Sequence, residues 1–171
     1  MKLLIAVAPE RFRDEELIEP MKIFASQGIE TVIGSTKTGE CLGMIGDRID
    51  ATITFEDAAI SDYDGIVIIG GIGSQDFFWN SQELIGLVRD FYDSGKVVAA
   101  ICLSPVVLAM AGILKGKKVT VFSSPASTHA MKTSGAVIVN EPVAVDGRII
   151  TANGPVAAEA FGEAIITVLK Q

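Results

Sequence analysis

Cys102 is the residue of this chain whose type and position most directly suggest chemistry. It stands between the apolar run 97–101 and a second apolar run that begins at Pro105. A strand that passes so directly into a helix forms a sharp turn, which can expose a side chain and strain its backbone. The positive end of the helix dipole then favours the thiolate, the nucleophilic form of cysteine. A buried, inert cysteine is the alternative, and the position at the junction favours the reactive interpretation.

A glycine-rich segment at residues 70–74 offers backbone N–H groups to a neighbouring site. Asp76 stands where a dinucleotide-binding GxGxxG motif would place its third glycine, and the segment is not a Walker loop. N–H groups at the end of a strand can hold a developing oxyanion. The N–H groups of Gly71 and Leu103 would form such a pair, and an ordinary tight turn is the alternative.

Acidic side chains gather in the stretch RDEELIEP at residues 13–20. Asp and Glu are favoured at the start of a helix in any protein, and Asp14 fits the N-cap position. No carboxylate in this stretch is distinguished from its neighbours by spacing alone. Pro20 is unfavourable deep inside a helix, which predicts a late or irregular helix start.

The elements that must position these residues alternate between strand and helix. The amphipathic patterns predict one helix that ends at Gly28, another over 81–92, a third from Pro105 to Gly112 and a last one from Pro155. Asp146-Gly147 predicts a hairpin turn, and residues 39–54 predict a small excursion of short strands. Continuous apolar runs predict strands buried on both faces, at residues 2–7, 29–35, 63–71, 96–101 and 117–122.

This alternation predicts an α/β fold with a mainly parallel sheet between two layers of helices. Its 171 residues suit a single domain spanning residues 1–171. Ligands of such sheets bind beyond the carboxyl ends of the strands. Function is therefore expected in the loops at those ends, which include residues 8–16, 70–76, 102–105 and 123–129.

Composition and charge exclude several classes of function. The net charge of −7 argues against nucleic acid or an anionic membrane as a partner. The N-terminal apolar run is too short for the core of a signal peptide, which predicts a cytoplasmic protein. Two cysteines and one histidine without metal-ligand spacing predict neither a disulfide framework nor a bound metal, and no cofactor is expected.

The motif AIC-x-x-P at residues 100–105, together with the GG pair and the late NGP, resembles the ThiJ/PfpI superfamily over essentially the whole chain. The resemblance implies a flavodoxin-like three-layer sandwich and a nucleophile-elbow cysteine at Cys102. It also implies oxyanion donors at Gly71 and Leu103, and a homodimer or higher oligomer. The resemblance further implies an acidic residue that hydrogen-bonds the cysteine and lies four positions before a proline, which is Glu16 here. The pKa of its carboxyl should be raised by the nearby thiolate and by partial burial.

Two positions depart from the pattern of this superfamily. Leu103 stands where peptidase-type members have histidine, and Phe122 stands near the histidine position of the deglycase-type branch. The single histidine, His129, is interpreted as a surface or packing residue. Proton transfer then falls to Glu16, to a hydroxyl such as that of Ser104, or to water.

The predicted function is an intracellular cysteine-dependent hydrolase, peptidase- or amidase-like, that acts on a small molecule or a peptide. The missing histidine argues against true proteolysis. One alternative is an oxidative-stress sensor or chaperone-like protein with an oxidisable Cys102. The other alternative functions are a small-molecule hydratase or glyoxalase-type enzyme, and a binding module with an inert Cys102.

Overall fold

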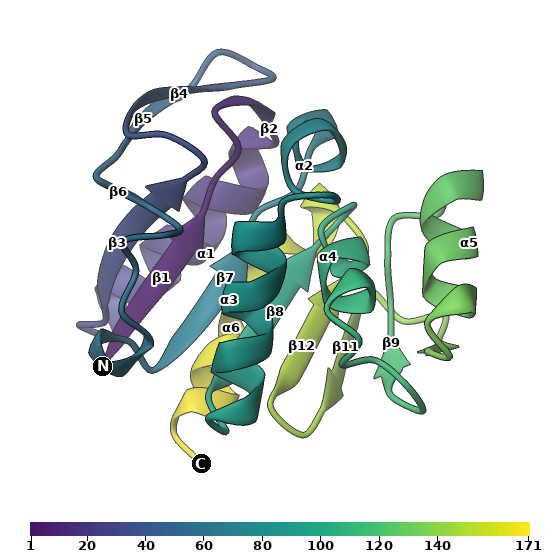
Figure 1. Cartoon of the computed structure of the whole chain (residues 1–171). Coiled ribbons are helices and arrows are strands. Elements are labelled where there is room, and N and C mark those ends of the chain that lie inside the picture. Colours follow the sequence, from purple (N-terminus) through teal and green to yellow (C-terminus); the bar gives the residue numbers. More distant parts are fainter.

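A seven-stranded sheet forms the centre of the computed structural model, which describes residues 1–171 (Figure 1). The strand order is β11-β12-β8-β7-β1-β3-β6, and every neighbouring pair is parallel except the hairpin β11–β12. The strands are β1 (Lys2–Ala6), β3 (Glu30–Ser35), β6 (Ile53–Thr54), β7 (Gly65–Ile68), β8 (Val97–Ile101), β11 (Val143–Asp146) and β12 (Ile149–Ala152). The predicted mainly parallel sheet is confirmed.

Helices cover both faces of this sheet, as the alternating pattern predicts. One layer contains α1 (Asp14–Ser26) and α6 (Ala158–Leu169), which pack against each other behind the sheet in Figure 1. The opposite layer contains α3 (Gln82–Asp93) and α4 (Pro105–Met110), with α5 (Pro125–Thr133) beside α4. The shorter elements are α2 (Ile72–Phe77) and the 3₁₀ turns η1 (Ile60–Asp62) and η2 (Pro155–Ala157).

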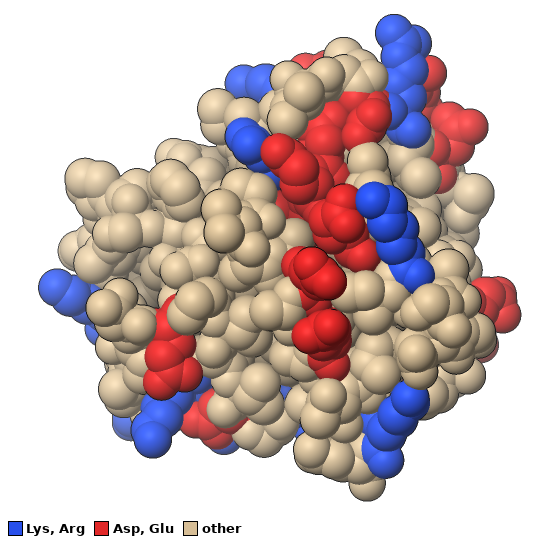
Figure 2. Space-filling model, turned by 180° about the vertical axis from the view of Figure 1, so that it is seen from behind, with Lys and Arg blue, Asp and Glu red and all other residues tan.

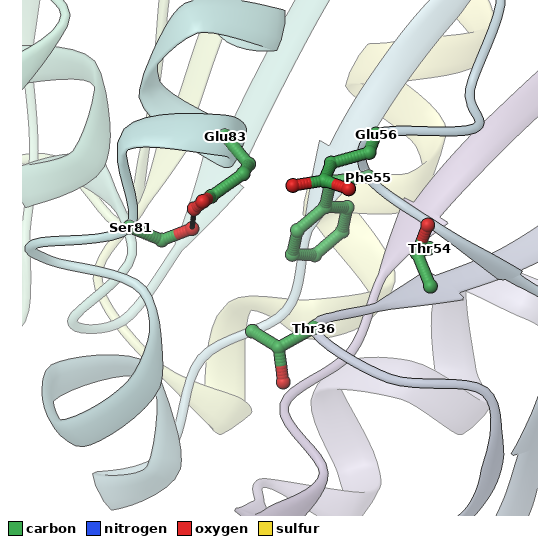
Figure 3. Close-up of a pocket in the computed structure, with 6 residues that line it drawn as sticks. All are labelled: Thr36, Thr54, Phe55, Glu56, Ser81 and Glu83. Atoms are coloured by element: carbon green, nitrogen blue, oxygen red, sulfur yellow. Dashed lines mark hydrogen bonds between the residues drawn. The ribbon is translucent and has the colours of Figure 1, made fainter.

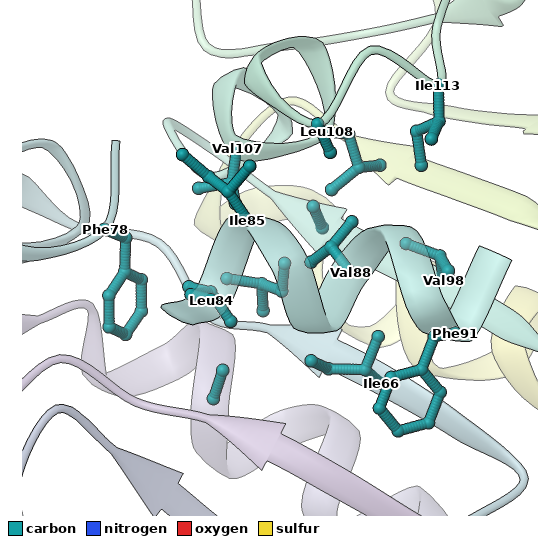
Figure 4. Packing of buried hydrophobic residues seen from close by; sticks show 14 of the residues in the cluster. Ile66, Phe78, Leu84, Ile85, Val88, Phe91, Val98, Val107, Leu108 and Ile113 are labelled. Carbon is teal, nitrogen blue, oxygen red and sulfur yellow. The ribbon is translucent and has the colours of Figure 1, made fainter. Parts of the chain in front are cut away.

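Successive strand residues point into two separate apolar cores, which explains the continuous apolar runs. In β1, Leu3 faces the α1–α6 layer and Leu4 faces the α3–α4 layer, and both are fully buried. Figure 4 shows the second core, where Leu84 and Phe91 of α3 pack with Ile66 of β7 and other apolar residues. The sheet is therefore fixed from both sides.

Two small sheets lie outside the central one. The predicted excursion contains β4 (Gly39–Gly43) and β5 (Arg48–Ala51), which join β2 (Glu10–Phe12) in a three-stranded sheet. The prediction of a fifth central strand at 117–122 is wrong. Only β9 (Lys118–Val119) forms there, paired with β10 (Val137–Ile138), because β12 of the hairpin occupies the place beside β8.

The first helix starts earlier than Pro20 suggested, so the expectation of a late start is wrong. Asp14 is buried, and its carboxylate accepts the N–H groups of Ile45 and Asp47 at 2.9 and 2.8 Å, which ties the helix start to the β4–β5 turn. Pro20 lies inside the helix against Gly162 of α6, where an added Cβ would lie 3.0 Å from the Pro20 Cα. The helix therefore continues through Pro20, which donates no backbone hydrogen bond, at a point where it packs against α6.

Acidic side chains form a band on the face shown in Figure 2, which is the rear of the view in Figure 1. Both α1 and α6 contribute acidic residues that are exposed or half-buried, including Glu19 and Glu163. None of the helices combines the length and the hydropathy that a membrane crossing requires.

Candidate active site

Cys102 occupies a strained turn between β8 and α4. Its backbone φ is 65°, and Arg11 is the only other non-glycine residue with a positive φ. Left-handed backbone is costly for a side chain with a Cβ, so the surrounding structure must hold it in place. The side chain is nearly buried, with 7% of the residue exposed. The elbow geometry predicted from the sequence is therefore present.

Hydrogen bonds from several segments hold this elbow. The Cys102 N–H donates to the Ala152 carbonyl at 2.9 Å, and the Cys102 carbonyl accepts from the Phe122 N–H at 2.8 Å. The Trp79 indole N–H donates to the Leu103 carbonyl at 2.9 Å. These bonds attach the strained peptide units around the thiol to β12, to the segment after β9 and to the turn after α2, and so hold them in place.

The N–H groups of Gly71 and Leu103 converge on the Cys102 thiol, where both act as donors that lower the pKa of that thiol. The close approach requires glycine at position 71. Its φ is 101°, and an added Cβ would lie 2.6 Å from the Arg11 carbonyl oxygen and from the Arg13 nitrogen. The structure thus brings together the two donors that the sequence predicted for an oxyanion.

Glu16 lies close to the thiol and is completely buried. One carboxyl oxygen, Oε2, accepts the Gly70 N–H at 3.0 Å, whereas Oε1 has no nitrogen or oxygen partner. A Cβ added to Gly70 would lie 2.5 Å from both the Cys102 Cβ and the Glu16 Oε2. Gly70 therefore provides the space in which the carboxyl and the thiol meet, a role that the sequence analysis missed although the GG pair marked the segment.

The Glu16 carboxyl and the Cys102 thiol share one buried site of low dielectric constant. Burial raises the pKa of Glu16 to about 7, although its hydrogen bonds with the Cys102 thiol and the Gly70 N–H act in the opposite direction. Burial, followed by the Glu16 charge, raises the pKa of the Cys102 thiol to about 12. The raised carboxyl pKa and its cause in burial agree with the prediction, but the expected contribution of the thiolate does not, because the hydrogen bond with Cys102 lowers this pKa. The shift of the thiol pKa runs opposite to the one expected for an activated thiolate, because burial and a negative neighbour outweigh the two N–H donors.

Glu16 predicts a loss of stability as the pH rises. The pKa of its carboxyl is about 7 in the folded protein and 4.5 as an unperturbed group. Between these values the folded state binds more protons than the unfolded state, so the free energy of unfolding decreases by about 3 kcal/mol as the pH rises from below 4.5 to above 7. Glu16→Gln should abolish this decrease, as measured by urea unfolding at pH 5 and pH 8. The exposed Glu163→Gln serves as the control, and an unchanged pH dependence in Glu16→Gln would contradict the assignment.

Ser104 does not serve as a proton donor to the thiol. It is fully buried, and its hydroxyl donates to the Ile69 carbonyl at 2.7 Å and lies 2.7 Å from the Ser74 hydroxyl. This hydroxyl pair instead connects the segment that carries Gly71 to the segment that carries Leu103. No spacing rule links Ser74 to Ser104 in the sequence, so the pair could not be predicted.

The hydroxyl pair predicts a coupled stability effect. Ser104→Ala leaves a buried carbonyl and the Ser74 hydroxyl without their partner, which should lower the free energy of unfolding by about 1–3 kcal/mol. Ser74→Ala and Ser104→Ala together should cost less than the sum of the two single substitutions, because they remove the same bond. Urea unfolding of the four proteins measures this, with Ser26→Ala at the exposed end of α1 as a control. Strict additivity would show that the pair is not a unit.

The remaining candidate residues are not positioned to transfer a proton to or from the Cys102 thiol. His129 is exposed on α5 and lines a surface hollow with Thr128 and Lys132, in agreement with its interpretation as a surface residue. Phe122 contacts the elbow through its backbone and carries no titratable group.

Arg13 was missed by the sequence analysis. Its positive charge lowers the pKa of Glu16, and its guanidinium binds the Glu15 carboxylate at 2.8 and 3.0 Å.

A pocket separate from the Cys102 site lies at the carboxyl ends of β3 and β6, next to the start of α3 (Figure 3). Its volume is about 210 Å³, and Ser81 in its wall donates a hydrogen bond to Glu83 at 3.1 Å. It contains none of the residues predicted for the site. No group of three or more His, Cys, Asp or Glu side chains is arranged as a metal site.

Comparisons with known proteins agree with this geometry. The profile of the DJ-1/PfpI family matches residues 1–168. An uncharacterized protein of Methanocaldococcus jannaschii is 49% identical over 170 residues, which cover 99% of this chain and 83% of that protein. A deglycase of Pyrococcus horikoshii is 31% identical, with 99% of this chain and 100% of the deglycase covered. The crystal structure of a ThiJ/PfpI domain protein from Brachyspira murdochii superimposes with a TM-score of 0.95 at 34% identity, covering 99% of this chain and 96% of that one. The chain belongs to the DJ-1/PfpI family.

Proposed function

We propose that this protein is a cysteine-dependent hydrolase of amidase, peptidase or deglycase type, in which Cys102 is the nucleophile and Glu16 moves the proton. One arrangement carries the proposal: two backbone N–H donors and a buried carboxyl with a pKa of about 7 surround a single thiol on a strained turn. A base with a pKa near neutrality is suited to proton transfer at physiological pH. The deglycase of P. horikoshii, a 31% identical relative, supports this class of activity.

The reaction starts from the neutral thiol. The Cys102 sulfur attacks the carbonyl carbon of an amide or related acyl compound while its proton passes to the Glu16 carboxylate. The carbonyl π electrons move to oxygen, and the oxyanion accepts hydrogen bonds from Gly71 and Leu103. When the tetrahedral adduct collapses, the leaving nitrogen takes the proton from Glu16, and a thioester remains.

Water completes the cycle through the same groups. Glu16 takes a proton from the attacking water, the second tetrahedral adduct expels the Cys102 sulfur, and the sulfur recovers that proton. The net reaction consumes one amide and one water and yields one acid and one amine. Proton transfer in this scheme needs no histidine, which suits a chain whose single histidine is exposed on α5.

The covalent intermediate provides the test. Rapid mixing of the protein with an activated amide or ester, followed by acid quenching and intact-mass measurement, should show one acyl group on Cys102. Peptide mapping should find none on Cys41, whose thiol is almost fully buried. His129→Ala should show the same acyl occupancy as the wild type. Turnover of the amide or ester without acyl transfer to Cys102 would contradict the proposal.

A second candidate function, oxidation sensing, rests on the Glu16 Oε1 atom. This buried oxygen has no nitrogen or oxygen partner, and its protonated form can donate a hydrogen bond to an oxygen added on sulfur. Each step would transfer one oxygen atom from hydrogen peroxide to Cys102 and release water. Two added oxygens on Cys102 after mild peroxide, with no turnover of any amide or aldehyde, would favour this candidate over the hydrolase.

A cytoplasmic location, a homo-oligomeric state and a substrate that is a small molecule or a peptide stay predictions.

A further inference from the structure

A groove of about 630 Å³ adjoins the elbow and has no part in the chemistry described above. Two of its walls are connected to the backbone of Cys102, one by a direct hydrogen bond and the other through the residue that precedes it in the chain. Phe122, in one wall, donates its N–H to the Cys102 carbonyl at 2.8 Å. Asn153 and Gly154, in another wall, follow Ala152, which accepts the Cys102 N–H at 2.9 Å. The groove therefore lies next to the Cys102 backbone, at the same carboxyl edge of the sheet.

The lining of this groove contains no charged side chain. Apolar surface comes from Phe122, Ile138 and Val156, which are 46%, 38% and 101% exposed. Hydrogen-bonding groups come from the side-chain amides of Asn140 and Asn153. Its volume lies within the usual range for small-ligand sites, and such mixed linings bind apolar groups with a few polar contacts.

An ionic group would fit this groove poorly. A carboxylate or phosphate that loses water against these side chains would have no cationic partner among them, and such desolvation is costly. An aromatic or aliphatic group with an amide or hydroxyl would bury its apolar part against Phe122 and Val156. Its polar part would meet Asn140 or Asn153.

We infer that this groove is a substrate subsite that selects uncharged, amphipathic groups and discriminates against anionic ones. The inference rests on the proposed function, because the groove acts by delivering its occupant to the Cys102 thiol. Its test uses alkylation rather than hydrolysis. Selectivity can therefore be observed even if the protein turns over no amide.

The experiment compares three thiol-alkylating probes: 2-chloroacetamide, N-benzyl-2-chloroacetamide and the benzyl compound with a para-carboxylate. Rates at Cys102 are measured by intact mass and peptide mapping, and each is divided by the rate of the same probe with glutathione. The benzyl probe should react at least about tenfold faster than chloroacetamide, because burial of an aromatic ring stabilises the encounter. The carboxylate should remove most of this gain.

Val156→Lys places a cation in the groove at a position that is fully exposed, so the fold is not perturbed. It should raise the rate of the carboxylate probe relative to that of the benzyl probe by roughly three- to fivefold, because the added cation attracts only the carboxylate and the loss of the Val156 side chain affects both aromatic rings alike. The matched control is Val145→Lys on β11, which is half-exposed and outside the groove, and it should change neither rate.

Three results would overturn the inference. The first is normalised rates that are equal for the three probes. The second is an equal effect of Val156→Lys and Val145→Lys. The third is a change in the sedimenting mass of the protein on Val156→Lys, because this would assign the groove to a contact between copies of the chain. Selective alkylation without hydrolysis would support the subsite and count against the hydrolase alone.

Discussion

Replacing Glu16 by glutamine is expected to lower kcat/KM by about 10²- to 10⁴-fold, the usual contribution of a positioned acid–base group. The wild-type rate should fall about tenfold for each pH unit below 7 and level off above it, because the carboxyl with a pKa of about 7 must be ionised to accept the thiol proton. In Glu16→Gln this dependence should disappear. Hydrolysis of an activated amide between pH 5 and pH 9 measures both effects.

Glu15→Gln is the matched control for Glu16→Gln. Glu15 is adjacent in sequence, but its carboxylate binds the Arg13 guanidinium. The step near pH 7 should remain in this variant. Above pH 7, unfolding cannot account for a loss of activity in Glu16→Gln, because that variant should be more stable than the wild type there. If Glu16→Gln kept the pH step, another group would be the base.

Gly70→Ala should remove most of the activity and lower the free energy of unfolding by about 1–3 kcal/mol. The added methyl would lie 2.5 Å from the Cys102 Cβ and the Glu16 Oε2, and 2.6 Å from the Ile101 carbonyl oxygen. These contacts can be relieved only if the neighbouring atoms move, and we expect this movement to separate the carboxyl from the thiol. Acyl transfer to Cys102 and urea unfolding are the two measurements.

Gly86→Ala provides the comparison for Gly70→Ala. Gly86 lies within α3, where a Cβ would meet nothing within 4 Å. Alanine favours helix over glycine, so this variant should be as stable as the wild type or more stable by up to about 1 kcal/mol. Its activity should not change. Full activity in Gly70→Ala would show that the carboxyl and the thiol need not be adjacent.

Local patterns in the sequence predict much of the fold and part of the site. The apolar runs locate the central strands because parallel strands bury both faces, and Asp146-Gly147 marks the hairpin because its turn needs a positive φ, which is 61° at Gly147. Cys102 was found because a strand and a helix start flank it closely. Glu16 was selected only by resemblance, since four acidic residues share its stretch.

The features that could not be predicted depend on contacts between distant segments. The run 117–122 has the composition of a central strand, but β12 takes the place beside β8, a competition that no local pattern records. The early start of α1 depends on hydrogen bonds from the β4–β5 turn to Asp14. The raised pKa of the Cys102 thiol depends on its own burial and on the charge of the nearby Glu16, which are properties of the assembled site.

The hydrogen bonds that hold the elbow also determine when in folding the site can appear. Glu16 and Gly70 are 54 residues apart in the chain, and Ser104 and Ile69 are 35 apart. Ala152, which accepts the Cys102 N–H, belongs to a strand near the C-terminus. Closing such long loops is entropically expensive and slow. Cys102 is therefore an ordinary flexible cysteine in a nascent chain until β12, the last strand in the sequence, docks beside β8. The reactive site around Cys102 forms only when the fold is complete.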